Sequence, residues 1–206
     1  MMSVGLFLEG IVIGFAIAAP VGPIGVLCIR RTLAEGRISG VVSGLGAATA
    51  DALYGSVAAL GLTFVTDLLV GGESWLRLLG GAFLIFLGAR TVLIRPAERA
   101  APFGGSGLLG DYASTLFLTL TNPTTILSFA AIFAGLGVAG EANGGVLSAT
   151  MLVPGVFLGS AMWWFVLSGL VGFFRAKLTA RGLRWVNRVS GTIIATFGVL
   201  AVVGLG

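Results

Sequence analysis

Six long runs of apolar residues, separated by short charged segments, dominate the pattern along the 206-residue chain. The runs span Val4–Ile29, Ile38–Phe64, Leu78–Ile94, Tyr112–Val138, Val146–Phe174 and Val189–Leu205. They are 17 to 29 residues long, and a helix of about 20 apolar residues crosses the hydrocarbon core of a membrane. The runs are continuous rather than alternating, which favours helices over strands. The pattern therefore predicts an all-α integral membrane protein with six transmembrane helices.

The composition agrees with a membrane protein. Hydrophobic residues make up 57% of the chain and charged residues 10%, whereas soluble domains carry about 25% charged residues. The 34 glycines fit closely packed membrane helices, in which small residues let backbones approach. The chain has one cysteine, Cys28, and no histidine. This inventory excludes a disulfide within the chain, a Cys/His metal site and histidine-based catalysis, so we expect no metal, no cofactor and no enzyme.

The basic residues predict the orientation of the helices. Eleven of the 12 Lys and Arg residues lie in or beside the first, third and fifth connections, and only Arg77 lies on the other side. Because basic residues stay on the cytoplasmic side, both termini are expected outside. The basic residues form no stripe for nucleic acid. The expected partners are the lipid bilayer and a small-molecule substrate, and a homo-oligomer remains open.

The six runs divide into two similar halves. Their lengths repeat as long, long and short, and the third and sixth runs each carry two glycines seven residues apart, Gly81 with Gly88 and Gly191 with Gly198. Three helices per half make the second half enter the membrane from the opposite side. The chain is therefore predicted to be one transporter domain, 1–206, built of two inverted repeats at about 1–95 and 111–206, joined by a cytoplasmic linker at about 96–110.

Helix-breaking residues occur at matching places in the two halves. The first run contains Pro20, Gly22 and Pro23, and the fourth contains Asn122-Pro123. Proline removes a backbone donor and clashes with the preceding turn, so helices 1 and 4 are predicted to be interrupted. A helix broken inside a membrane offers free backbone groups to a ligand. The alternative is a pair of ordinary proline kinks in a six-helix bundle, and Pro154 in the fifth run is interpreted as a simple kink.

Asp51 is the strongest single candidate for a binding residue. It lies at the centre of the second run, thirteen residues from each end. A carboxylate at that depth costs about 3 kcal/mol on insertion scales, so it should face a cavity or a partner. Small residues surround it at helical spacing, including Gly44, Ala47 and Ala48. The alternative is a structural aspartate that caps a broken helix or pairs with an arginine.

Other positions are weaker candidates. Thr121, Thr124 and Thr125 flank the second break and could supply hydroxyls to a ligand or bond back to their own helix. Trp163 and Trp164 lie deep in the fifth run and could close over a substrate or pack in the core. Two small-residue motifs, Gly10-xxx-Gly14 and Gly155-xxx-Gly159, indicate helix packing. Arg30 and Arg31 are interpreted as topology signals.

These residues together resemble the LysE/RhtB family of bacterial amino-acid exporters. The resemblance rests on Gly22-Pro23, Arg30-Arg31, Gly36-Arg37, the segment from Gly44 to Ala48 that leads to Asp51, Gly61, and Asn122-Pro123. It implies an inner-membrane efflux carrier driven by an ion gradient. The chain departs from the family pattern at Val21, Ile24 and Thr124, where a substrate would lie.

The combined interpretation is a secondary exporter of amino acids or closely related small solutes. The chain has no G-x-x-x-x-G-K-[ST] motif for nucleotide binding, so energy must come from an ion gradient or from downhill flow. The expected binding residues are Asp51, Pro20, Gly22, Pro23, Asn122, Pro123 and Thr124. Asp51, as the one central titratable group, would carry proton antiport. The alternatives are a membrane subunit or scaffold of a larger complex, or an exporter of a metal ion.

Overall fold

The computed structural model describes residues 2–20, 22–59, 73–93, 107–122, 124–129, 145–175 and 179–203. Those residues form helices and connecting turns without any strand, which confirms the predicted all-α class. Pro123, an expected binding residue, and Gly61, part of the family resemblance, lie outside the described residues.

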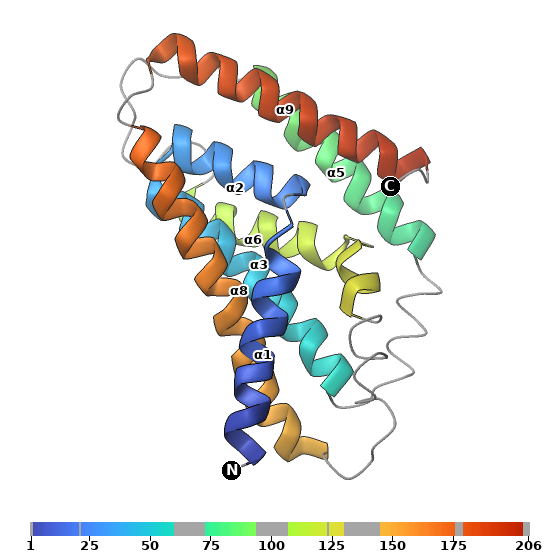
Figure 1. Cartoon of the computed structure of the whole chain (residues 1–206). Coiled ribbons are helices and arrows are strands. Elements are labelled where there is room, and N and C mark those ends of the chain that lie inside the picture. Colours follow the sequence, from blue (N-terminus) through green and yellow to red (C-terminus); the bar gives the residue numbers. More distant parts are fainter. Residues whose placement is uncertain are drawn as a thin grey trace.

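Seven helices of twelve or more residues appear in the described part of the chain (Figure 1). They are α1 (Met2–Ala18), α2 (Pro23–Ala34), α3 (Arg37–Ala59), α5 (Glu73–Leu93), α6 (Gly107–Leu120), α8 (Gly145–Arg175) and α9 (Ala180–Val203). A short helical segment at 124–129 follows α6. Helix α9 begins nine residues before the predicted apolar run, because its first turns are amphipathic and expose Arg181, Arg184 and Trp185.

The first apolar run is interrupted where its prolines predict. Helix α1 ends at Ala18, helix α2 begins at Pro23, and the two axes are bent by 82°. Proline suits the first helical position because its fixed φ is helical and a donor there has no intrahelical partner. Gly22 precedes it with an extended backbone (φ −97°, ψ −164°). The break therefore follows from the local sequence.

A glycine ends α2 and turns the chain into α3. Gly36 has a φ of +117°, a left-handed conformation that side chains other than hydrogen disfavour. Its N–H and that of Glu35 both donate to the carbonyl of Arg31, at 3.0 and 2.7 Å. These bonds satisfy carbonyl groups that a helix end leaves open, so Gly36 sets the tight α2–α3 connection.

In the described part of the chain, two helices are long and apolar enough to cross a membrane, with spans at Ala149–Arg175 and Arg184–Val203. The bent pair α1 and α2 makes a third if it counts as one span. A shorter apolar stretch, Leu78–Leu93, lies in α5. Pro154 lies inside α8, which continues on both sides of it.

Glycines allow α1 and α8 to touch along their backbones. The two helices run side by side (Figure 1). A Cβ on Gly10 or Gly14 would overlap a backbone carbonyl of α8, and a Cβ on Gly155 or Gly159 would overlap one of α1. The two small-residue motifs are thus a packing interface between these helices, as the sequence predicts.

A second glycine contact joins α5 and α9. A Cβ on Gly81 would lie 2.8 Å from the carbonyl oxygen of Gly198, and one on Gly198 would lie 2.6 Å from that of Gly81. Gly88 and Gly191 face each other in the same reciprocal way, at 2.6 and 2.7 Å. The four glycines that the sequence pairs by spacing therefore meet in space.

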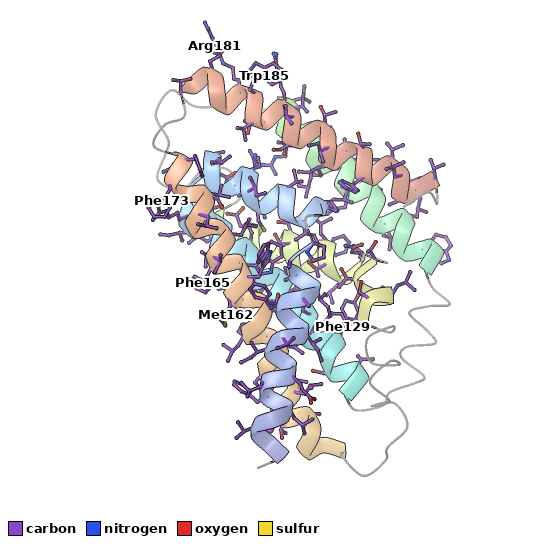
Figure 2. The ribbon with its side chains drawn as sticks, viewed as in Figure 1. Phe129, Met162, Phe165, Phe173, Arg181 and Trp185 are labelled. Atoms are coloured by element: carbon purple, nitrogen blue, oxygen red, sulfur yellow. The ribbon has the colours of Figure 1, made fainter. Side chains whose placement is uncertain are left out.

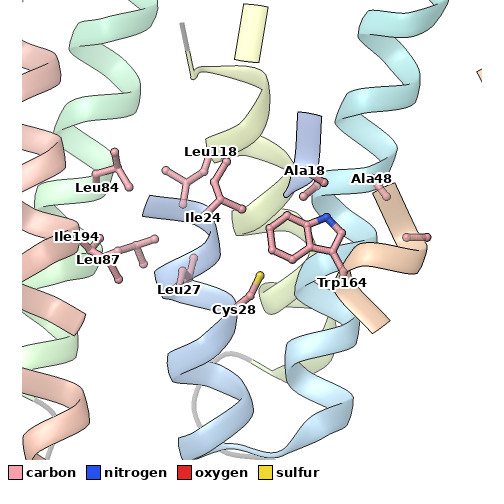
Figure 3. Close-up of a cluster of buried hydrophobic side chains, with 12 residues drawn as sticks. Ala18, Ile24, Leu27, Cys28, Ala48, Leu84, Leu87, Leu118, Trp164 and Ile194 are labelled. Atoms are coloured by element: carbon pink, nitrogen blue, oxygen red, sulfur yellow. The ribbon is translucent and has the colours of Figure 1, made fainter. Parts of the chain in front are cut away.

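The described side chains divide between a small core and a largely apolar exterior. The core around Leu27, Cys28 and Trp164 joins α2 to its neighbours (Figure 3). Large apolar side chains such as Met162, Phe165 and Phe173 project outward from α8 (Figure 2). Extensive exposed apolar surface is typical of a protein whose exterior meets lipid.

Candidate functional site

A cavity of about 350 Å³ lies where the two helix breaks meet. Pro20, Gly22 and Pro23 line it from the first break, Asn122 and Thr124 line it from the second, and Asp51 lines it from α3. Six of the seven residues that the sequence nominates therefore surround one space, and the seventh, Pro123, lies outside the described residues. Helices α5, α8 and α9 complete the wall with Gly80, Gly81, Leu84, Trp164, Phe197 and Ala201.

The first break leaves backbone groups at the cavity. The N–H of Gly22 donates to the carbonyl of Pro20 at 3.0 Å, and the N–H of Val26 donates to the carbonyl of Gly22 at 3.0 Å. The first N–H groups of a helix have no partner within the helix. In α2 these groups belong to Ile24 and Gly25, which line the cavity. The start of α2 is therefore suited to an anionic group such as a carboxylate.

The second break is organised by Asn122. Its Oδ1 accepts a hydrogen bond from the N–H of Thr124 at 3.1 Å, and its carbonyl accepts from the N–H groups of Thr125 and Ile126 at 3.1 and 3.3 Å. Asn122 thus caps the short helical segment 124–129. The sequence allows the Thr121 hydroxyl either to donate to a ligand or to bond back to its own helix. It donates to the carbonyl of Phe117 at 2.9 Å, which is the second of these roles.

Asp51 is a buried carboxylate inside α3, with 3% of its surface exposed. Its Oδ2 accepts a hydrogen bond from the Ser160 hydroxyl at 2.7 Å, and Ser160 in turn accepts one from the indole N–H of Trp164 at 3.2 Å. The ion pairs among the described residues, Arg30–Glu35 and Arg31–Asp111, do not involve it. Asp51 faces a cavity and a serine rather than an arginine.

The small residues near Asp51 divide between packing and cavity. A Cβ on Gly44 would overlap the side chain of Trp164, and one on Gly40 would overlap that of Thr32. These glycines therefore bring α3 against its neighbours. Ala47, one turn from Asp51, lines the cavity instead.

The two tryptophans of α8 have different surroundings. Trp164 lines the cavity, and its indole lies among Ala18, Ala48 and Cys28 (Figure 3). Trp163 packs edge-to-face on Phe15, with ring centroids 5.4 Å apart. Of the two, Trp164 is the one placed to meet a ligand.

A buried polar cluster lies two turns along α2 from the cavity, and the sequence alone gave Arg31 only a topological role. All three nitrogens of the Arg31 guanidinium have partners. Nε lies 3.2 Å from Oδ1 of Asp111, and Nη2 donates to Ser114 at 2.8 Å. Nη1 donates to Ser43, Thr115 and the Asp111 carbonyl, each at 2.9 Å. Ser39 donates to Oδ2 of Asp111 at 2.5 Å. The polar spacing Asp111, Ser114 and Thr115, all on one face of a helix, is the signal that would have indicated a buried partner.

A second ion pair extends this cluster. Arg30 donates from Nη1 to Glu35 at 2.9 Å and from Nε to the side chain of Asn187 on α9 at 3.2 Å. Burial raises the pKa of the Glu35 carboxyl above its ordinary value, and the Arg30 guanidinium opposes that rise. Together the two pairs tie α2 to α3, α6 and α9.

The broken apolar helices and the cavity with its one buried carboxylate define a helical membrane transporter. Residues 15–204 match the family described as LysE type translocator, and the chain belongs to that family.

The relatives agree along most of the chain. A Bacillus subtilis (strain 168) protein named "Putative amino acid efflux protein YcgF" is 28% identical over 197 residues, which cover 94% of this chain and 93% of that protein. An Escherichia coli (strain K12) protein named "Uncharacterized membrane protein YahN" is 29% identical over 185 residues, covering 83% of this chain and 77% of that one. No solved structure matches the chain.

Proposed function

We propose that this protein exports amino acids or closely related small solutes across the bacterial inner membrane by proton-coupled alternating access. The observation that carries the proposal is the cavity that joins both helix breaks to Asp51. The efflux named for the Bacillus subtilis relative supports the same direction of transport.

The architecture proposed for this activity is six transmembrane helices in two inverted repeats. If the repeats are superposed by sequence, Gly81 corresponds to Gly191 and Gly88 to Gly198. Under a two-fold axis between the repeats, a contact of Gly81 with Gly198 implies the equivalent contact of Gly191 with Gly88, and α5 and α9 make both. This reciprocity supports inverted repeats over two unrelated kinks. The basic bias of the odd connections supports an orientation with both termini outside.

The chemistry of the cavity favours a zwitterion or a cation. Asp51 is the one charged side chain among the described lining residues. We propose that Asp51 holds the substrate ammonium and that the first N–H groups of α2 hold its carboxylate. Asn122 and Thr124 offer polar groups at the opposite break. Apolar walls from Leu84, Leu118 and Phe197 would accommodate a side chain of the solute.

Energy would come from protons that move inward. Exporting a cation against an inside-negative potential costs about 2.3 kcal/mol per charge per 100 mV, and exchange for an incoming proton offsets that cost. Asp51 would carry the proton on the return step. The substrate ammonium binds the ionised carboxylate, and a bound proton removes that negative charge, so the two compete for Asp51.

Alternating access requires one end of the cavity to be closed. Along α2, the cavity residues Pro23 to Gly25 are followed by Leu27 and Cys28, which are buried, and then by the Arg31 cluster. The same order occurs along α3, from Asp51 through Ala47 to Ser43. We propose that this polar cluster is the cytoplasmic gate, in its closed state.

Purified protein in proteoliposomes would test the function. Vesicles are loaded with a mixture of the twenty protein amino acids, a pH gradient is imposed, and the released amino acids are identified by mass spectrometry. We expect a small subset of the amino acids to leave these vesicles faster than they leave loaded vesicles without the protein. The Asp51→Asn variant should abolish that release.

Two other outcomes would replace the proposal. Release of no amino acid, combined with transport of divalent metal ions in parallel vesicles, would make the protein a metal exporter. Failure to move either class would favour a subunit or scaffold that acts only within a larger complex.

A further inference from the structure

Three polar residues of α8 lie one turn apart on the side that faces α3. They are Ser160, Trp164 and Ser168, and all three are buried. Ser160 contacts Asp51, Trp164 fits against Gly44, and Ser168 lies by Gly40. The two serines differ in one respect: the Ser160 hydroxyl has two partners, whereas that of Ser168 has none among the described residues.

The direction of the hydrogen bonds between these residues is determined by chemistry. An indole N–H can only donate, so Ser160 must accept from Trp164. A serine hydroxyl has a single hydrogen, and here that hydrogen goes to Oδ2 of Asp51. Oδ2 is therefore an acceptor. The other oxygen, Oδ1, accepts no hydrogen bond from the described part of the chain.

We propose that Ser160 and Trp164 are positioning residues that hold Asp51 with Oδ2 as a permanent acceptor and leave Oδ1 for the transported proton or the substrate ammonium. The inference rests on the proposed function and names residues of the same site. Trp164 acts through Ser160, because its N–H occupies a lone pair of the hydroxyl and prevents the hydroxyl from rotating away from Asp51. Gly44 is part of the device, since a side chain there would displace the indole.

The test compares three substitutions in the intact protein. Ser160→Ala removes the donor to Asp51, and Trp164→Phe keeps an aromatic ring but removes the N–H. Ser168→Ala is the matched control, because it makes the same change on the same helix face at a hydroxyl without a described partner. The probe is the twenty-amino-acid mixture in proteoliposomes, titrated to give a half-saturating concentration and a maximal rate.

We expect Ser160→Ala to raise the half-saturating concentration about tenfold, the usual effect of losing a hydrogen bond to a charged group, with a maximal rate within about twofold of wild type. Trp164→Phe should give a smaller rise in the same constant. The double variant should equal Ser160→Ala alone, because both residues act through one hydroxyl. Ser168→Ala should match wild type, and Ser160→Thr should restore binding, since it keeps the hydroxyl.

Each contrary result has a distinct meaning. If Ser160→Ala has the same half-saturating concentration as Ser168→Ala, Ser160 does not position Asp51 and the inference fails. If the double variant loses the product of the two single losses, Trp164 acts on the solute directly. A misfolded variant lowers the maximal rate and leaves the half-saturating concentration unchanged. If Asp51→Asn transports at the wild-type rate, the proposed function itself fails, whatever the serine variants do.

Discussion

The guanidinium of Arg31 and the carboxylate of Asp111 lie 3.2 Å apart, although eighty residues separate them in the sequence. Both side chains are buried, and the hydroxyls of Ser39, Ser43, Ser114 and Thr115 form hydrogen bonds with them. Breaking one partner of a buried ion pair costs about 3–5 kcal/mol, because it leaves a charge uncompensated. Removing either partner should therefore weaken the packing of α2 against α6, at the end of the molecule where the basic residues gather.

Asp111→Asn should loosen this packing and expose the native Cys28, which is buried on α2 between the cavity and Arg31. We expect a membrane-impermeant maleimide applied from the cytoplasmic side to modify Cys28 at least about tenfold faster than in wild type, because the barrier to opening falls by part of the pair's energy. Arg181→Gln, which changes an exposed arginine of α9, is the control. If Cys28 stays as protected in a folded Asp111→Asn protein as in wild type, the cluster is not the gate.

Asp51→Asn should abolish gradient-driven export while the fold is retained. The amide has the size of the carboxylate and can still accept the hydrogen bond from Ser160, but it carries no charge and releases no proton. Asp51→Glu should keep part of the activity with altered affinity, since its carboxylate is displaced by one methylene. Uptake of the amino-acid mixture into inverted vesicles under an imposed pH gradient measures both. Wild-type accumulation by Asp51→Asn would make Asp51 a structural residue.

Gly44→Ala and Gly55→Ala make the same change on α3 in different surroundings. A Cβ on Gly44 would overlap Trp164, whereas one on Gly55 would lie 3.6 Å from Val156, an ordinary contact. We expect Gly44→Ala to lower the free energy of unfolding by about 1–3 kcal/mol. Gly55→Ala should be neutral or raise it by up to about 1 kcal/mol, because alanine is the better helix former. Thermal unfolding in detergent decides the order, and the reverse order would contradict the packing.

Pro23→Ala should impair transport, and Pro154→Ala should not. Pro23 begins α2 at the cavity, so alanine there weakens the stop between α1 and α2. Pro154 lies inside continuous α8, where alanine restores a helical hydrogen bond and should raise the unfolding temperature. The comparison uses release from proteoliposomes at equal amounts of inserted protein. Equal rates for both variants would mean that the first break is an incidental kink.

Cysteines placed in a Cys28→Ser background should report the orientation. A cysteine at Asn143, in the fourth connection, should react with an impermeant thiol reagent added outside intact spheroplasts, and one at Thr179, in the fifth, should not. The reason is the concentration of basic residues in the odd connections. External labelling at position 179 without labelling at 143 would reverse the topology.

Local signals in the sequence predicted the parts of the site that depend on the backbone. Proline and glycine dictate φ and hydrogen bonding within a few residues, so the breaks before Pro23 and at Asn122 could be read directly. Asp51 stood out because a charge is costly in an apolar run. The partners of these residues could not be read in the same way. Ser160 is 109 residues from Asp51, and a serine in an apolar helix carries no local mark of its partner.

Arg30 and Arg31 illustrate a second reason why the sequence did not predict every buried polar contact. Basic residues beside an apolar run serve topology in most membrane helices, so the pattern favours that role. Their burial against Glu35 and Asp111 depends on how α2, α3 and α6 pack, which hydropathy does not encode. The ion pairs of the two arginines could therefore be found only from the tertiary structure.

The glycine contact between α5 and α9 has a mechanical consequence. The two backbones touch at Gly81–Gly198 and at Gly88–Gly191, so no side chain at these points can bend out of the way if one helix moves toward the other. We therefore expect the two helices to move as one rigid pair. Gly80 and Leu84 lie on one half of it, Phe197 and Ala201 on the other, and all four line the cavity. In the proposed alternating access, this wall would move as one piece and would open or shut the space for a solute in a single step.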